Sequence, residues 1–138
     1  MGRAWRIEYE GGLYHVLSCG NDRKDIFYDD QDRLMFLDVI GQMVDNYDVD
    51  VFAYVLMSNH YHILLRTNQT NLSKSMQWLA LTYTRRFNKR HFRSGHLFQG
   101  RFKSINAVQR RDSSAIRHDL FGGKPYFKFD ASQNGKET

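Results

Sequence analysis

The hydrophobic and polar positions in the first half of the chain predict a strand, a helix and two further strands. Residues 13–18 form a short run typical of a strand, and residues 33–47 carry apolar side chains at helical spacing. Asp32 is the expected N-cap of that helix. Apolar runs at residues 51–57 and 61–66 follow, and the short polar stretch between them indicates a hairpin.

The second half of the chain predicts a helix, a strand and another helix. The first of these helices is expected to begin near Asn71 or Ser73, because apolar residues recur at helical spacing from there to Phe87. Residues 100–108 indicate a strand, and residues 112–120 a short helix. This order predicts an α+β fold, with one mainly antiparallel sheet and helices packed on one face.

The composition is that of one ordinary globular domain. The chain has 138 residues, of which 41% are hydrophobic, and this length suffices for a core. No apolar run approaches the ~18 residues of a membrane-spanning helix, and the first residues lack the apolar core of a signal peptide. Cys19 is the single cysteine, so neither an intrachain disulfide nor a cysteine-based zinc site is expected. We therefore expect a cytoplasmic protein without membrane contact.

The charges are distributed unevenly. The segment from Val51 to Arg111 holds 11 of the 20 basic residues and none of the 15 acidic ones, although the net charge is only +5. Such a segment, which includes His60 and His62, predicts one strongly positive region beside these two histidines and suited to a polyanion, and nucleic acid is the leading partner. The alternative is a solvated basic helix without a ligand.

Two histidines, His60 and His62, lie between the two apolar runs of the expected hairpin. Side chains two positions apart on a strand point to the same face, so the two imidazoles lie together and Tyr61 points to the other face. Such a pair is half of a divalent-metal site. In an arbitrary protein, structural hydrogen bonding is the commoner role of such a pair, so its neighbours decide the interpretation.

Five blocks of sequence resemble one family when taken in order. They are Gly12–Val16, Gly20–Phe27, Ala53–Leu65, Tyr83–His91 and Gly95–Ser104. Together they are similar to the IS200-like Y1 transposases of the HUH endonuclease superfamily, in the branch of REP-associated tyrosine transposases. The similarity extends over about residues 3–108, which is most of the chain.

This resemblance implies a ferredoxin-like fold with His60 and His62 on a central strand. It implies a divalent ion, Mg²⁺ or Mn²⁺, and single-stranded DNA with hairpins as the partner. It further implies a tyrosine that attacks a DNA phosphate and leaves a covalent 5′-phosphotyrosine and a free 3′-OH. Family members occur as monomers and as dimers, so a homodimer stays open.

The residue types suit this chemistry. A phenol with a pKa near ~10 is a poor nucleophile until a cation favours the phenolate, and both a metal and a basic surface supply positive charge. Arginine side chains interleaved with aromatic rings are the usual means of binding single strands. The expected DNA-binding residues are Arg85, Arg86, Lys89, Arg90, Arg93, Arg101 and Lys103.

The nucleophile is where the sequence departs from the family. The family's tyrosine lies on a helix beyond the strand 100–108, but residues 112–121 contain no tyrosine. Tyr126 is the only tyrosine after that strand, and Asp130 lies four residues later, on the same face if the segment is helical. Tyr126 is therefore the candidate nucleophile and Asp130 the candidate third metal ligand, whereas Tyr83 is expected in the core.

Three interpretations stay open. The leading one is a metal-dependent transposase-like nuclease for single-stranded DNA, with a domain at residues 1–121 and a divergent tail at residues 122–138. The second is an inactive hairpin-DNA-binding domain with the same fold and an altered C-terminus. The third is an RNA-binding α+β domain whose histidines are structural.

Overall fold

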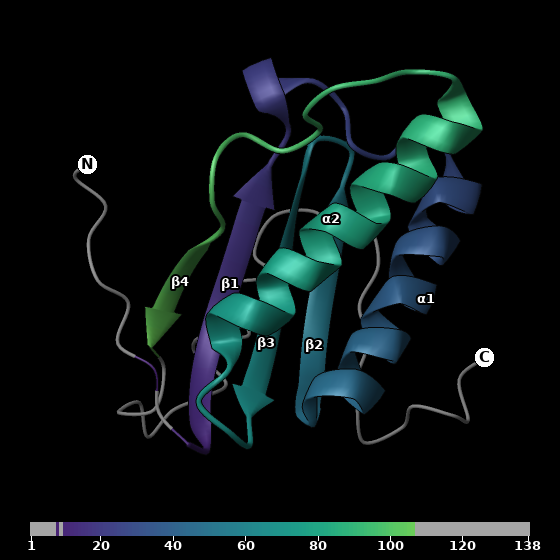
Figure 1. Cartoon of the computed structure of the whole chain (residues 1–138). Coiled ribbons are helices and arrows are strands. Elements are labelled where there is room, and N and C mark those ends of the chain that lie inside the picture. Colours follow the sequence, from purple (N-terminus) through teal and green to yellow (C-terminus); the bar gives the residue numbers. More distant parts are fainter. Residues whose placement is uncertain (1–7, 9, 107–138) are drawn as a thin grey trace.

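The elements of the fold follow the predicted order. The computed structural model describes residue 8 and residues 10–106 (Figure 1). Its elements are β1 (Gly12–Cys19), the short 3-10 turn η1 (Asn21–Arg23), α1 (Asp30–Tyr47), β2 (Val49–Met57), β3 (His60–Thr67), α2 (Leu72–His91) and β4 (Lys103–Asn106). The strand, helix, hairpin, helix and strand expected from the sequence are all confirmed.

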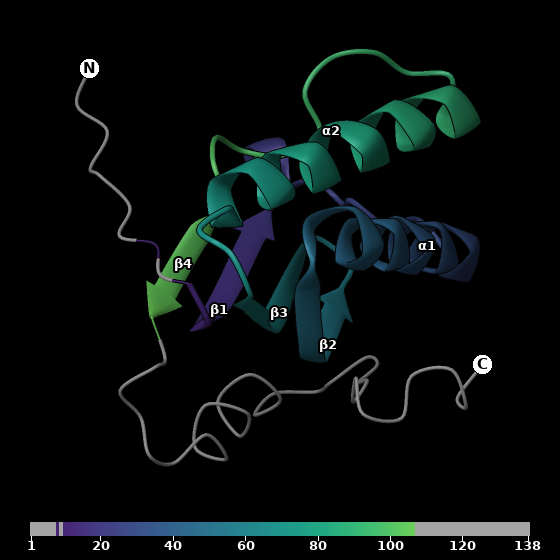
Figure 2. The ribbon, with the colours of Figure 1, turned by 60° about the horizontal axis from the view of Figure 1, so that its bottom comes forward.

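The strands form a single antiparallel sheet in the order β2-β3-β1-β4. Both helices cover the same face of this sheet, and the two layers are clear when the molecule is turned (Figure 2). The order βαββαβ with this strand arrangement is the ferredoxin-like topology. The predicted α+β fold class is therefore confirmed.

The start of α1 differs from the prediction. The helix begins at Asp30 and its N-cap is Asp29, whose carboxylate accepts a 3.0 Å hydrogen bond from the Asp32 backbone N–H. The prediction of Asp32 as the cap was therefore wrong. Both residues are aspartates that suit a cap, and their spacing alone does not decide between them. Asp32 is instead a fully buried residue of the first turn.

Alternating burial along the strands separates the two faces of the sheet. In β1, Tyr14 and Val16 are buried under the helices, whereas the side chains at the alternate positions 13, 15, 17 and 19 are only partly covered. β2 changes phase through a bulge between Val51 and Ala53, which places one extra residue in that strand. Ala53 thereby joins a small apolar cluster with Val55 and Leu64, separate from the core under the helices.

Aromatic rings fill the core between the sheet and the helices. The ring centroid of Phe36 lies 4.9 Å from that of Tyr61 and 5.0 Å from that of Tyr83. The Tyr83 hydroxyl donates a 2.6 Å hydrogen bond to the Ile26 carbonyl, and burial raises the pKa of both tyrosines above the usual range. Tyr61 thus points away from the histidines and Tyr83 is a core residue, as predicted.

Several predictions fall outside the described residues. They are the end of the strand beyond Asn106, the helix at residues 112–120, the residues Tyr126 and Asp130, and the division of the chain after residue 121. Within the described residues, neither helix combines the length and the apolar character that crossing a membrane requires.

Candidate functional site

The two histidines lie on the face of the sheet that the helices leave uncovered. Both are partly covered, whereas Tyr61 between them is buried on the helix side. Cross-strand pairing places His62 between Val55 of β2 and Leu17 of β1. The ring centroids of the two histidines are 5.2 Å apart, so the pair expected from the sequence is present on an inner strand.

His60 is oriented by the hairpin turn that precedes it. Its Nδ1 lies 2.9 Å from Oδ1 of Asn59, and Nδ2 of Asn59 in turn donates a 3.2 Å hydrogen bond to the Arg23 carbonyl. Because that contact assigns the amide nitrogen to Arg23, the amide oxygen accepts from the His60 Nδ1–H. The backbone N–H of Gly20 also donates to the Asn59 carbonyl at 2.9 Å, so the turn is anchored twice.

Gly20 is needed for that anchoring because there is no room for a side chain. A Cβ atom at this position would lie 2.0 Å from the Lys24 carbonyl oxygen, well inside van der Waals contact. A glycine lets the segment after β1 turn back on itself without a clash. In that segment the Gly20 N–H and the Arg23 carbonyl both contact Asn59.

His62 has its own partner on the neighbouring strand. Its Nδ1 lies 2.9 Å from Nε2 of His15, and the two ring centroids are 5.1 Å apart. Each of the two candidate ligands thus has a hydrogen bond at Nδ1. Nε2 of His60 and Nε2 of His62 have no hydrogen-bond partner among the described residues.

Both histidines are held in the neutral form at pH 7. Burial is the main cause that lowers the pKa of His62 to about 4, and the nearby His15 and His60 lower it further. Burial also lowers the pKa of His60. Neutral imidazole is the form that binds metal, so little competition from protons is expected above pH 6.5.

The pair fits half of a divalent-metal site. Each imidazole has a contact at Nδ1 and no hydrogen-bond partner at Nε2 among the described residues, and metal-binding histidines usually have an outer partner at the second ring nitrogen. Among the described residues, no group of three or more histidine, cysteine, aspartate or glutamate side chains is placed to hold an ion. Asp130, the predicted third ligand, lies outside the described residues.

Three of the arginines expected to bind DNA have partners within the protein. Arg86 pairs with Asp38 at 2.8 Å, and Arg93 donates to the His96 carbonyl at 3.3 Å. Arg90 contacts both Asp29 and Asp32, at 2.7 and 2.6 Å. The pKa of Asp29 is lowered to about 2, mainly by the hydrogen bonds from Arg90 and to a smaller extent by that from the Asp32 backbone N–H. The contacts of Arg86 and Arg90 join α2 to α1 and its N-cap.

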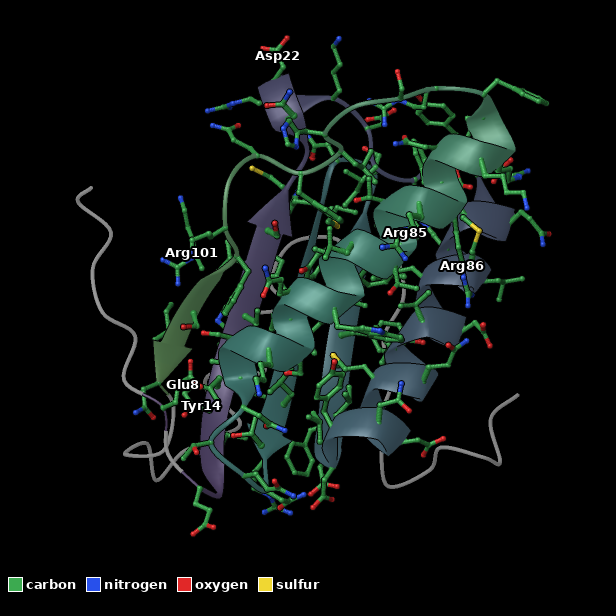
Figure 3. The ribbon with its side chains drawn as sticks, in the orientation of Figure 1. Glu8, Tyr14, Asp22, Arg85, Arg86 and Arg101 are labelled. Atoms are coloured by element: carbon green, nitrogen blue, oxygen red, sulfur yellow. The ribbon has the colours of Figure 1, made fainter. Side chains whose placement is uncertain are left out.

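The side chains of four of the expected basic residues have no hydrogen bond or ion pair with other described residues. They are Arg85, Lys89, Arg101 and Lys103, and all are exposed. Figure 3 shows Arg86 directed toward α1 and Arg101 near the start of β4. Lys103 pairs with Leu17 across the β1–β4 ladder, so it lies on the same face as His62.

The basic residues of α2 therefore lie in a different layer from the histidines. The sequence predicted one positive region beside the histidine pair, but α2 packs on the opposite face of the sheet. The reason is that Tyr83 and Phe87 on α2 fill the core under that face. Of the expected DNA-binding residues in the strands, Lys103 is on the histidine face.

The sequence matches a family model described as transposase IS200 like over residues 9–118, which is most of the chain. The chain belongs to the IS200-like transposase family. No curated protein matches it at a significant level.

Two solved structures resemble the fold of this IS200-like transposase. One is a REP-associated tyrosine transposase bound to a REP hairpin, with a TM-score of 0.65 and 16% identity, covering 87% of this chain and 68% of that one. The other is a candidate transposase from Deinococcus radiodurans, with a TM-score of 0.58 and 16% identity, covering 87% of this chain and 94% of that one.

The tyrosines that the structure describes in this IS200-like transposase all lie on the helix side of the sheet. Of the eight tyrosines in the chain, only Tyr9 and Tyr126 lie outside the described residues. The other six belong to the core or pack against it or against α2: Tyr14, Tyr28, Tyr47, Tyr54, Tyr61 and Tyr83. A tyrosine nucleophile for the histidine face must therefore come from outside the described residues.

Two residues of the site, His15 and Asn59, were missed by the sequence analysis. Asn59 was assigned only to the turn, and its contact with His60 depends on the turn geometry. His15 lies in a predicted strand, at a position that points to the open face. Its contact with His62 depends on which strands pair and in which register, and periodicity within one strand does not contain that information.

The contacts of Asp32 predict a structural role for the end of α2 in this IS200-like transposase. Asp32 is fully buried and accepts from Arg90, from His91 and from the Tyr28 backbone N–H at 2.8 Å. Replacing Asp32 with Asn removes the charge at constant volume, and we expect a loss of about 2 kcal/mol in the free energy of unfolding, since hydrogen bonds to charged groups are worth about that much.

The matched control is Asp38→Asn, which removes the exposed partner of Arg86. An exposed ion pair is worth at most about 1 kcal/mol, so this variant should unfold close to the wild type. Urea unfolding at pH 7 measures both variants. Equal losses for the two would contradict the structural role of the buried carboxylate.

Proposed function

We propose that this protein is a metal-dependent transposase that cuts and rejoins single-stranded DNA carrying hairpins. One observation carries the proposal: on the open face of the sheet of an IS200-like transposase, two neutral histidines each have a contact at Nδ1 and no partner at Nε2 among the described residues. The hairpin as substrate is supported by the similar REP-associated transposase, which is bound to a REP hairpin.

His60 and His62 are the proposed protein ligands of Mg²⁺ or Mn²⁺, and Asp130 is the proposed third. When bound, such an ion polarises the scissile phosphate and stabilises the charge that develops there. The two histidines are two positions apart on an inner strand of the sheet, so they are fixed in position before an ion binds.

Tyr126 is the proposed nucleophile. Its phenol oxygen, after losing its proton, forms a bond to the scissile phosphorus, the bond from phosphorus to the 3′ oxygen breaks, and that oxygen takes up a proton. The products are a 5′-phosphotyrosine and a free 3′-OH. The burial of the described core tyrosines supports this assignment, because a phenol with a raised pKa and no access to the open face cannot serve.

Lys103 is proposed to bind a DNA phosphate beside the histidines, since it lies on their face and has no acidic partner among the described residues. Arg101 precedes it and is also exposed. On α2, Arg85 and Lys89 are proposed to contact a more distant part of the DNA backbone, in the layer of the helices.

The test is incubation of the wild-type protein with labelled single-stranded hairpin DNA and Mn²⁺, followed by a denaturing gel. A shortened strand together with a protein–DNA band that survives denaturation is the expected result. Binding of the hairpin without either band would instead indicate the second candidate. Preference for an RNA hairpin without metal uptake would favour the RNA-binding domain.

The second candidate is a hairpin-DNA-binding domain that does not cut. It is favoured by the absence of a tyrosine from the histidine face within the described residues, and from residues 112–121 of the sequence. The histidines would then hold the face of the sheet together without catalysis. The same gel distinguishes the two, since only the transposase forms the covalent band.

Phe92 is predicted to stack on an unpaired base. It is 95% exposed and follows α2 in a left-handed conformation with φ of 51°, where glycine is the usual residue. A phenylalanine there neither packs nor relieves strain, and exposed Lys89 lies close to it in the sequence. Phe92→Ala should weaken hairpin binding about fivefold or more, because stacking is worth about 1–3 kcal/mol per base.

Fluorescence anisotropy with a labelled single-stranded hairpin measures this effect. The matched control is Leu81→Ala, which removes a side chain that is also apolar and 53% exposed on α2 but lies before the basic end of the helix. Equal affinities of the two variants would contradict a stacking role for Phe92.

A further inference from the structure

His15 is the residue whose position the proposed function does not yet explain. It lies on β1 and faces the open side of the sheet, where it pairs directly with Leu64 of β3 and Ile105 of β4. His62 pairs directly with Leu17, two residues further along β1, so His15 and His62 are diagonal neighbours. Side chains in this relation are within reach of each other, and here Nε2 of His15 lies 2.9 Å from Nδ1 of His62.

One proton is shared in that contact, and its location decides what His62 can do. If His15 Nε2 carries the proton and donates, then Nδ1 of His62 is an acceptor and Nε2 of His62 holds the hydrogen. That tautomer cannot bind a metal through Nε2. If His62 Nδ1 carries the proton and donates to His15, the lone pair of His62 Nε2 is available. Only the second arrangement suits a ligand.

The surroundings favour a fixed contact. The two residues stand on adjacent inner strands, with ring planes tilted by 35° and centroids 5.1 Å apart. Leu64, which pairs with His15, is almost completely buried. His60 needs no such help, because Asn59 holds its Nδ1 and the Arg23 carbonyl fixes the Asn59 amide. The amide oxygen of Asn59 can only accept from His60. The imidazole of His15 can either donate to His62 or accept from it, so its role depends on its tautomer.

We propose that His15 is a positioning residue: its Nε2 accepts the Nδ1–H of His62 and thereby directs the Nε2 lone pair of His62 to the metal. The inference rests on the proposed function in one respect, namely that a metal binds at this pair. The hydrogen bond and the tautomer it selects are properties of the protein without metal. They can be measured separately.

The first experiment records the ¹⁵N chemical shifts of the histidine side chains at pH 7 in the metal-free protein, with the His62 signals assigned through His62→Gln. His62 is expected to carry its hydrogen on Nδ1 in the wild type and in His15→Gln, whose amide oxygen can accept at a similar reach. In His15→Phe the hydrogen is expected on Nε2. Wild-type His62 with its hydrogen on Nε2 would overturn the proposal.

The second experiment measures Mn²⁺ affinity by electron paramagnetic resonance. His15→Phe keeps a ring of similar size and is expected to bind Mn²⁺ about 10- to 100-fold more weakly, the usual effect of losing an outer hydrogen bond to a metal ligand. His15→Gln should lie close to the wild type. Equal affinity of His15→Phe and the wild type would overturn the positioning role.

The two experiments separate this inference from the proposed function. If the wild type takes up no Mn²⁺, the metal-dependent function fails, and the ¹⁵N shifts alone then decide whether His15 sets the tautomer of His62. Urea unfolding of His15→Phe shows whether the fold is intact, and the His15→Gln comparison keeps the result decisive if the ring variant unfolds.

Discussion

Replacing Tyr126 with phenylalanine is expected to abolish the covalent protein–DNA band completely. Phenylalanine keeps the ring but has no oxygen to form the bond to phosphorus, so neither the 5′-phosphotyrosine nor the free 3′-OH can arise. Affinity for the hairpin should stay within about twofold, because the change removes one hydroxyl and no charge. A denaturing gel of labelled hairpin DNA with Mn²⁺ measures the band, and anisotropy measures binding.

Two tyrosine variants serve as controls for this result. Tyr83→Phe removes the hydroxyl that donates to the Ile26 carbonyl, so it should lower stability and leave the band in the folded protein. Tyr9→Phe changes the other tyrosine outside the described residues. A band that persists in Tyr126→Phe and disappears in Tyr9→Phe or Tyr83→Phe would move the nucleophile to that residue.

Replacing His62 with alanine is expected to remove Mn²⁺ binding and to slow strand cleavage by at least about 10²-fold, the size of loss that follows removal of one preorganised group that stabilises charge. The imidazole is the only group at this position that can offer a nitrogen to the ion. Affinity for the hairpin without metal should persist, since the basic residues are unchanged. Metal uptake, cleavage rate and anisotropy measure the three quantities.

His96→Ala is the matched control, because His96 is an exposed histidine in the loop after α2 and lies outside β3, the strand that carries the pair. It should bind Mn²⁺ as the wild type does. Unchanged Mn²⁺ uptake in His62→Ala and in the double variant His60→Ala/His62→Ala would contradict the metal site and favour structural histidines.

The spacing of the apolar residues and the order of the predicted elements were enough to predict most of the fold. The alternation of Tyr14 and Val16 with less buried neighbours, and the helical spacing that ends at Phe87, depend on local geometry that one strand or one helix determines alone. The histidine pair could be predicted for the same reason, since two positions of one strand share a face whatever the strand pairs with.

The contacts of charged and polar side chains could not be predicted in this way. The basic run that predicts Arg90 as a DNA-binding residue does not show its contacts with Asp29 and Asp32, which lie more than 50 residues away in the sequence and contact it only when α1 packs beside α2. The sequence shows the charges of a helix and does not show which of them the neighbouring helix neutralises. For the same reason His15 looked like an ordinary strand residue.

The hydrogen bond between His15 and His62 joins two strands that are far apart in the sequence, since the two residues are 47 positions apart. The proposed orientation of His62 therefore requires that β1 stays paired with β3. Binding of the proposed ion and the pairing of these strands would then be linked equilibria: an ion that binds the paired state would stabilise it, and loosening of β1 would lower the apparent affinity for the ion by the same factor. The Mn²⁺ affinity of the proposed site would thus report how firmly the two inner strands are paired.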